Sequence, residues 1–378
     1  MIMTPLPRRI LMTADAAGGI FDYVLELSGV LSARGVEVLL AATGTGLTDR
    51  QLQALNAIEG LKIFECPFRV EWMDEPLGDI DAAGEWLLEI ENSTRPDVVH
   101  LNDYPHGSLP WRAPCMVVGH SGVLSGRGVS GKPAPTRVHE YERRVRRGLR
   151  HAALVVAPSR ATLLALRESY GPLERSRVIY HGRRPRDLGS PIKQPFVFSI
   201  GRLWEEPTGM HTIDRAAVDL AWPALVAGST EPRRIVSQVP SRPPEYAHFL
   251  GPLDSDAIEA MLGRAAIFAH PGPNEPGSFS VLEAALAECA LVLADIPSLR
   301  EIWQDAAIFV PPGDATALHR ELGGLIENSV DRAAWGIRAR RAARRFTASR
   351  MASEYLAAYR AVMSAPSARR DEENSAYA

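Results

Sequence analysis

Apolar residues recur along the chain in two alternating patterns. Short apolar runs at Arg9–Thr13 and Val36–Ala41 predict buried strands. Between them, apolar positions follow helical spacing from Ile20 to Arg34, and Gly35 comes next, as glycine does just past a helix. A strand, a loop, a helix and a strand in this order predict the start of a parallel sheet.

The alternation continues with one interruption. Further strands are predicted at Val98–Leu101, Met116–Val118, Ala153–Val156 and Arg177–Tyr180, and then at Phe196–Ile200, Ala224–Ala227, His248–Leu250, Ile267–Ala269, Leu291–Ala294 and Ile308–Val310. Between the two groups, the polar and proline-rich segment His181–Pro195 predicts a domain boundary. The fold class is therefore α/β, with two Rossmann-like, doubly wound domains at 1–186 and 187–350 and ligands expected at the carboxyl ends of the strands.

The C-terminal region and the composition add a few expectations. An amphipathic helix is predicted at Met351–Met363, and residues 364–378 are expected to be disordered. The length of 378 residues fits two domains, and a net charge of −3 gives no reason to expect nucleic-acid binding. We expect a cytoplasmic protein, because there is no signal-peptide core and no apolar run of about 20 residues. The basic run Arg332–Arg350 is interpreted as a solvated helix face, with contact to an anionic membrane as the less favoured alternative.

The segment with the most chemical information surrounds two glutamates, Glu275 and Glu283, which lie eight positions apart. A loop rich in proline and glycine precedes a helix that is predicted to begin near Ser278–Ser280. Free backbone amides at a helix start bind anions, and carboxylates beside them hold sugar hydroxyls. The alternative is structural, because Ser280 and Glu283 also match a capping box.

Three other segments follow predicted strands and are expected to face the same cleft. Arg202 follows the strand Phe196–Ile200, and its planar guanidinium suits a diphosphate. Gly18 and Gly19 would let a phosphate or a sugar approach the backbone closely. His120 follows the strand Met116–Val118 and is placed to hydrogen-bond a sugar hydroxyl or a leaving group. Together these segments predict an anionic ligand between two domains.

The order and spacing of these motifs resemble glycosyltransferase family 4, whose members have the two-domain GT-B fold. The glutamate pair with Ser280-Val281-Leu282-Glu283-Ala284, the sequence Gly201-Arg202-Leu203 and the pair Gly18-Gly19 carry the resemblance, which extends from Ile10 to about Met363.

The resemblance implies a metal-independent, retaining transfer of a hexose from a nucleotide donor, such as UDP-glucose or GDP-mannose, to an unidentified acceptor. It implies no cofactor. It assigns Arg202 to the diphosphate, Glu275 to sugar hydroxyls, Glu283 to the ribose, and His120 to the transferred sugar. It assigns Ser278, Phe279 and Ser280 to the phosphate. It assigns Phe249 and Leu250 to the base, and Gly18 and Gly19 to the wall of the cleft. It also implies that the last helix crosses back onto the first domain.

Two departures from the family pattern support other hypotheses. Thr208 stands where the family usually has a second diphosphate-binding lysine, and the family's Glu-Pro-Phe-Gly reads Glu-Pro-Gly-Ser from Glu275. The main alternative is a catalytically impaired member that acts as a nucleotide-binding or partner protein. A third reading is another reaction on the same scaffold, such as a sugar phosphorylase or a nucleotide-sugar epimerase.

Overall fold

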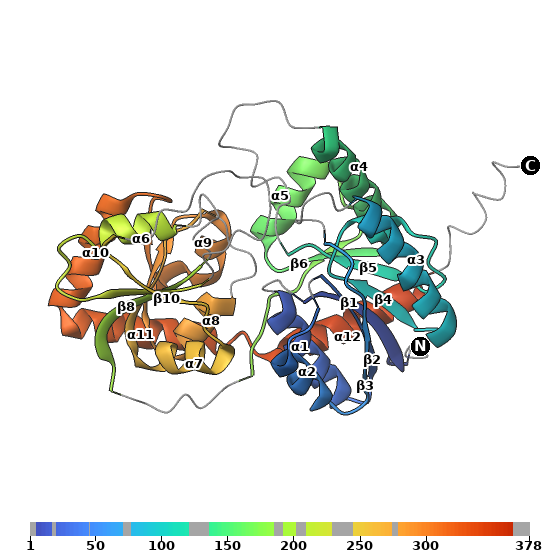
Figure 1. Ribbon diagram of the computed structural model, residues 1–378, viewed down its shortest axis with the longest axis horizontal. Coiled ribbons are helices and arrows are strands. Elements are labelled where there is room, and N and C mark those ends of the chain that lie inside the picture. Colours follow the sequence, from blue (N-terminus) through green and yellow to red (C-terminus); the bar gives the residue numbers. More distant parts are fainter. Residues whose placement is uncertain are drawn as a thin grey trace, which may run out of the picture.

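The computed structural model describes residues 5–16, 20–44, 46–70, 77–120, 136–184, 192–201, 209–228, 245–273 and 279–365. Two parallel β-sheets, each flanked by helices, lie side by side in it (Figure 1). The predicted boundary at 186/187 and most of the predicted disordered tail lie outside the described residues.

The first sheet has seven strands in the order β3-β2-β1-β4-β5-β6-β7. Its strands are β1 (Arg9–Asp15), β2 (Glu37–Thr43), β3 (Leu61–Glu65), β4 (Val98–Leu101), β5 (Cys115–Val118), β6 (Leu154–Ala157) and β7 (Ser176–Val178). The helices around it are α1 (Ile20–Ser32), α2 (Asp49–Asn56), α3 (Leu77–Thr94), η1 (Pro105–Ser108), α4 (Thr136–His151) and α5 (Arg160–Tyr170). The strand order reverses between β1 and β4, which makes that point a topological switch.

The second sheet has six strands in the order β10-β9-β8-β11-β12-β13, so its switch point lies between β8 and β11. Its strands are β8 (Gln194–Ile200), β9 (Ala224–Ala227), β10 (His248–Gly251), β11 (Ala265–His270), β12 (Ala290–Ala294) and β13 (Ile308–Val310). The remaining helices are α6 (Met210–Ala216), α7 (Ser255–Arg264), α8 (Phe279–Leu286), α9 (Pro297–Trp303), η2 (Gln304–Ala306), α10 (Ala315–Glu327), α11 (Ser329–Ala343) and α12 (Ala348–Ser364).

The central strands are largely apolar because both of their faces are buried. In β1, Ile10 and Met12 belong to one hydrophobic core and Leu11 to another, as alternation along a strand requires. In β8, Phe198 and Val197 divide between two cores in the same way. The two predicted doubly wound sheets are therefore confirmed.

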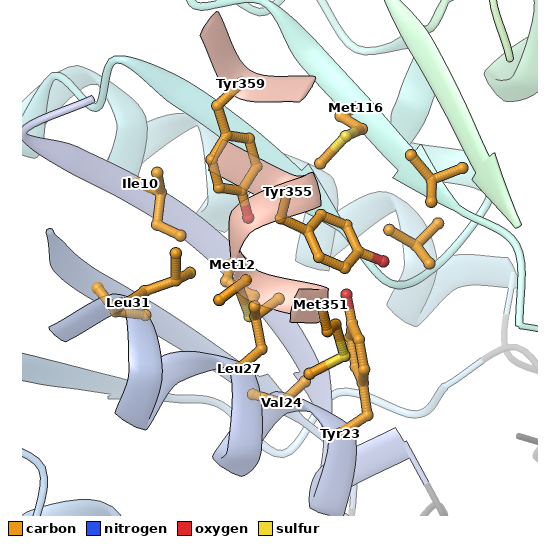
Figure 2. Close-up of a cluster of buried hydrophobic side chains, with 14 of the residues drawn as sticks. Ile10, Met12, Tyr23, Val24, Leu27, Leu31, Met116, Met351, Tyr355 and Tyr359 are labelled. Carbon is orange, nitrogen blue, oxygen red and sulfur yellow. The ribbon is translucent and has the colours of Figure 1, made fainter. Parts of the chain in front are cut away.

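The last helix, α12, packs on the first sheet although the second sheet precedes it in the chain. Met351, Tyr355 and Tyr359 enter the core that contains Ile10 and Leu27 (Figure 2). The chain therefore crosses between the domains twice.

The two crossings, at Gly182–Arg183 and Phe346–Ala348, are joined to each other. The backbone amide of Arg183 donates to the Phe346 carbonyl at 3.0 Å, and the amide of Ala348 donates to the Arg183 carbonyl at 3.1 Å. A Cβ atom at Gly182 would lie 2.3 Å from the carbonyl oxygen of Thr347, so this close approach requires glycine.

Candidate functional site

The described residues that flank the loops after β8, β9 and β11 lie against one another at the switch point of the second sheet. A Cβ atom at Gly228 would lie 1.6 Å from the Gly201 carbonyl oxygen, and one at Gly209 would lie 2.5 Å from the Gly272 amide nitrogen. These glycines border the segments that carry Arg202 and Glu275, which are themselves outside the described residues together with Gly18, Gly19 and Ser278. The residue after the segment that carries Arg202 therefore lies beside the residues before the segment that carries Glu275.

Helix α8 follows the second of these loops and brings Glu283 to the domain interface. The Nε atom of Arg183 donates to Oε1 of Glu283 at 2.8 Å, and its Nη2 atom bonds the same oxygen. Ser280 lies inside α8, whereas the residue that starts a capping box lies outside its helix. Ser280 is therefore not the N-cap residue of α8, and the capping-box alternative does not explain the contacts of Glu283 with Arg183.

Arg183 also reaches the first domain. Its Nη1 atom donates to Oε2 of Glu26 on α1 at 3.2 Å, while the backbone amide and Nε of Arg184 donate to Oε1 of Glu26 at 3.0 and 2.8 Å. The side chains of Arg183 and Glu26 are only 4% and 3% exposed. Burial alone lowers the pKa of Arg183, but the carboxylates of Glu283, Asp22 and Glu26 together raise it above its ordinary value, so the guanidinium stays charged.

A row of aromatic rings continues from α8 into the first domain. Phe279, the first residue of α8, stacks on His181 with ring centroids 5.0 Å apart. The His181 ring lies 5.4 Å from His120 and 5.0 Å from Tyr23. Phe279 is buried in the core that contains Ile10 of β1, so the helix that carries Glu283 is anchored in the opposite domain.

His120 ends this row at the carboxyl end of β5, and a hydrogen bond fixes its orientation. Its Nε2 atom lies 2.9 Å from Oδ1 of Asn102, while Nδ2 of Asn102 donates to the Thr13 carbonyl at 2.7 Å. Burial, followed by the neighbouring His181 and His100, lowers the pKa of His120, so the ring is neutral. Because Asn102 presents its oxygen, His120 carries its proton on Nε2, and Nδ1 is the nitrogen able to accept a hydrogen bond.

A pocket opens beside Asn102 at the switch point of the first sheet. Its lining includes Thr13, Arg69 and His106, and residues from the start of α3. Asp103 receives a hydrogen bond from the Thr13 hydroxyl at 3.1 Å and lies 2.7 Å from Nδ1 of His106. Although burial raises the pKa of Asp103, the contacts with His106 and Thr13 lower it below its ordinary value, so the Asp103 carboxylate stays ionised beside His106 at the base of the pocket.

The remaining predicted residues occupy different surroundings. Phe249 packs partly buried against a core of the second domain, and Leu250 is 39% exposed at the end of the edge strand β10. Ser280 is half-buried in the first turn of α8. The structure thus brings His120, Phe279 and Glu283 into one continuous interface and leaves Phe249 and Leu250 at the rim of the second sheet.

The arginines of the basic run contact their own chain. Arg332 and Arg338 lie over Trp222 and Trp335, Arg340 pairs with Glu288, and Arg345 bonds the Ile302 carbonyl. None of the described helices has the length and apolar character needed to span a bilayer. Across the same described ranges, no cluster of three or more His, Cys, Asp or Glu side chains could hold a metal ion.

Sequence reasoning missed four residues that organise this interface: Glu26, Asn102, His181 and Arg183. In the sequence, Arg183 indicates only a polar linker between domains, and Glu26 lies in an ordinary helical pattern. Two of the four gave a detectable signal, since Asn102 and His181 directly follow the predicted strands Val98–Leu101 and Arg177–Tyr180.

Comparisons with known proteins define the class of this chain. Its fold matches sucrose-phosphate synthase from Thermosynechococcus elongatus, with a TM-score of 0.79 at 17% identity over 95% of this chain and 100% of that one. It also matches Anabaena Alr3699/HepE in complex with UDP and glucose, with a TM-score of 0.71 at 18% identity over 93% of this chain and 99% of that one. The fold is GT-B, with two facing Rossmann-like domains.

Family models cover most of the sequence. The model Glycosyltransferase Family 4 matches residues 17–186, and Glycosyl transferases group 1 matches residues 183–342. Phosphatidyl-myo-inositol mannosyltransferase from Mycobacterium leprae is 27% identical over 47% of this chain, and the match spans 50% of that relative's length. The two models together cover residues 17–342 and support a GT-B glycosyltransferase of the family 4 type.

Proposed function

We propose that the chain transfers a hexose from a nucleoside diphosphate donor to a hydroxyl acceptor, with retention at the anomeric carbon and without a bound metal or cofactor. The observation that carries the proposal is the domain-spanning row from Glu283 through Phe279 and His181 to His120. This row links the helix expected to bind the nucleotide with the histidine expected to contact the sugar.

The donor is assigned to the switch point between β8 and β11. Arg202 and the amides near Ser278 and Ser280 bind the diphosphate in this proposal, since the start of a helix favours anions. Glu283 accepts hydrogen bonds from the ribose, and Glu275 from hydroxyls of the sugar. Phe249 and Leu250 border the base.

The acceptor is assigned to the first domain, in the pocket beside Asn102 and Asp103. The neutral His120 accepts a hydrogen bond from a sugar hydroxyl through Nδ1. Gly18 and Gly19, which precede α1, form the wall on the same side. We therefore expect sugar and acceptor to meet between β1, β4 and α8.

The reaction breaks the bond between the anomeric carbon and the β-phosphate oxygen and forms a bond from that carbon to the acceptor oxygen. The acceptor proton goes to the leaving phosphate, which completes the nucleoside diphosphate. Negative charge grows on the phosphate as the bond breaks, so Arg202 and the helix start stabilise the transition state more than the ground state.

The alternative is a catalytically impaired member that binds a nucleotide or a partner. It is favoured by Thr208 in place of a second cation and by the shifted glycine at Gly277. A charge-assisted hydrogen bond contributes about 1.5–3 kcal/mol, so the missing lysine slows turnover by roughly ten- to a hundredfold unless another cation replaces it.

A donor-consumption assay separates the hypotheses. UDP-glucose and GDP-mannose are tested because one structural neighbour is described with UDP and glucose and the M. leprae relative as a mannosyltransferase. We expect release of the diphosphate from one donor by the wild type, loss of release in Arg202→Ala and Glu275→Gln, and normal release in the exposed control Arg341→Ala. Binding without release supports the impaired member, and release that depends on inorganic phosphate supports a phosphorylase.

A further inference from the structure

Arg183 connects three parts of the molecule that are far apart in the sequence. It belongs to the first crossing between the domains, bonds Glu283 of α8 through Nε and Nη2, and bonds Glu26 of α1 through Nη1. Its backbone is tied to the second crossing at Phe346 and Ala348. The guanidinium is therefore fixed in place from both domains at once.

The contact with Glu283 restricts how that carboxylate can turn. The terminal torsion of a glutamate is broad, so a free carboxylate samples many orientations. Two nitrogens of one rigid guanidinium meet the same oxygen, Oε1, so this contact fixes the position of that oxygen and restricts rotation of the carboxylate. The Arg183 guanidinium also lies 5.3 Å from the centroid of Phe279, one turn earlier on α8, so both sides of the contact are held.

Arg184 shows what a purely structural arginine does at this place. Its backbone amide and its Nε atom both bond Glu26 of the first domain, and its side chain is 58% exposed. Arg183 differs from it by reaching the second domain and by being buried. The pair therefore provides a matched comparison of neighbouring arginines on one carboxylate.

We propose that Arg183 is a positioning residue for ribose recognition: it orients the Glu283 carboxylate to accept the ribose hydroxyls and fixes that orientation relative to α1. This inference rests on the proposed function, in which Glu283 binds the ribose. It adds a residue that contacts no nucleotide and acts through Glu283.

The test measures discrimination rather than affinity alone. Dissociation constants of the full chain are determined by calorimetry for UDP and GDP and for their 2′,3′-dideoxy counterparts. A hydrogen bond to a charged group corresponds to roughly a tenfold or greater preference for the ribonucleotide in the wild type. We expect Arg183→Met and Glu283→Gln to reduce that preference to within about twofold of unity, and Arg184→Met to keep it.

The outcomes are distinguishable. If Arg183→Met weakens the binding of a ribonucleotide and of its dideoxy counterpart equally, the preference is intact. That result overturns the inference and shows that Arg183 is structural. A wild type that binds nucleotides without ribose preference also overturns it, while the transferase proposal stands. A folded wild type that binds neither nucleotide overturns both. If Arg183→Met does not fold, Arg183→Lys serves instead, because it keeps the charge but loses the two-nitrogen contact, and its preference is expected to fall at least threefold.

Discussion

His120 and Asn102 come from the carboxyl ends of adjacent strands and meet at 2.9 Å, with the amide oxygen facing Nε2 of the ring. The Asn102 amide is oriented in turn by the carbonyl of Thr13. His120, which the sequence assigns to the sugar, is thus held in one tautomer by Asn102, a residue that the sequence alone did not identify.

Removing either partner should affect turnover more than donor affinity. We expect His120→Ala to lower kcat by about two- to tenfold, since a hydrogen bond of about 0.5–1.5 kcal/mol is lost at the sugar. Asn102→Ala should act in the same direction with a smaller effect, because the ring remains but its tautomer is no longer fixed. Steady-state kinetics with the identified donor check this, with the exposed His151→Ala as control. Unchanged kcat in His120→Ala would remove this histidine from the sugar site.

The buried His100 predicts a dependence of stability on pH. Its ring lies 2.7 Å from the Tyr359 hydroxyl and 3.2 Å from the Tyr23 hydroxyl, and burial lowers its pKa to about 3. Below pH 6.5 the unfolded chain therefore binds a proton that the folded protein excludes, so the unfolding free energy falls with falling pH until about pH 3.

His100 alone should lower the unfolding free energy by about 2 kcal/mol between pH 6.5 and pH 5. Urea unfolding of wild type and His100→Gln at both pH values measures this contribution as a difference of differences. The variant should be less stable at pH 6.5 and lose less on acidification. Equal losses in the two proteins would show that His100 does not cause the dependence.

Glu301 on α9 joins the domains at a second place. Its two carboxylate oxygens accept from the backbone amides of Arg160 and Ala161 at the start of α5, at 2.9 and 2.8 Å, and Oε1 also accepts from the Tyr180 hydroxyl at 2.6 Å. We expect Glu301→Ala to lower the unfolding free energy by about 1–3 kcal/mol through the lost helix cap and hydroxyl partner. Glu354→Ala, which removes an exposed pair with Arg350, should change it by less than about 0.5 kcal/mol in the same denaturation experiment. Similar effects in both variants would exclude a special role for Glu301.

Gly182 should tolerate no side chain. An added Cβ would meet the carbonyl of Thr347, so Gly182→Ala is expected to separate the two crossings and to destabilise the protein by about 2 kcal/mol or more. The matched control is Gly324→Ala inside α10, where no atom of the described residues lies within 4 Å of the added Cβ and alanine favours the helix by about 0.5–1 kcal/mol. Thermal melts of the two variants should shift in opposite directions, and a Gly182→Ala protein as stable as wild type would contradict the close approach.

The sequence predicted the sheets more completely than it predicted the site. Continuous apolar runs such as Met116–Val118 and Leu291–Ala294 identified strands because strands buried on both faces leave few polar positions. The strand Leu61–Glu65 was missed because it lies at the sheet edge and is only partly buried. Glutamates and a histidine after strands were recognisable by position. The partnership of Arg183 with Glu26 and Glu283 was not, since it joins residues about a hundred or more positions apart.

In the proposed function, the nucleotide binds in a cleft on the second domain that faces His120 across the interface. Calorimetric titration of the purified protein with UDP, GDP, ADP and TDP in the presence of a metal chelator tests it most directly. We expect one nucleotide to bind without metal, and Arg202→Ala and Glu283→Ala each to weaken its binding about tenfold or more. Absence of binding of all four nucleotides by the folded wild-type protein would contradict it.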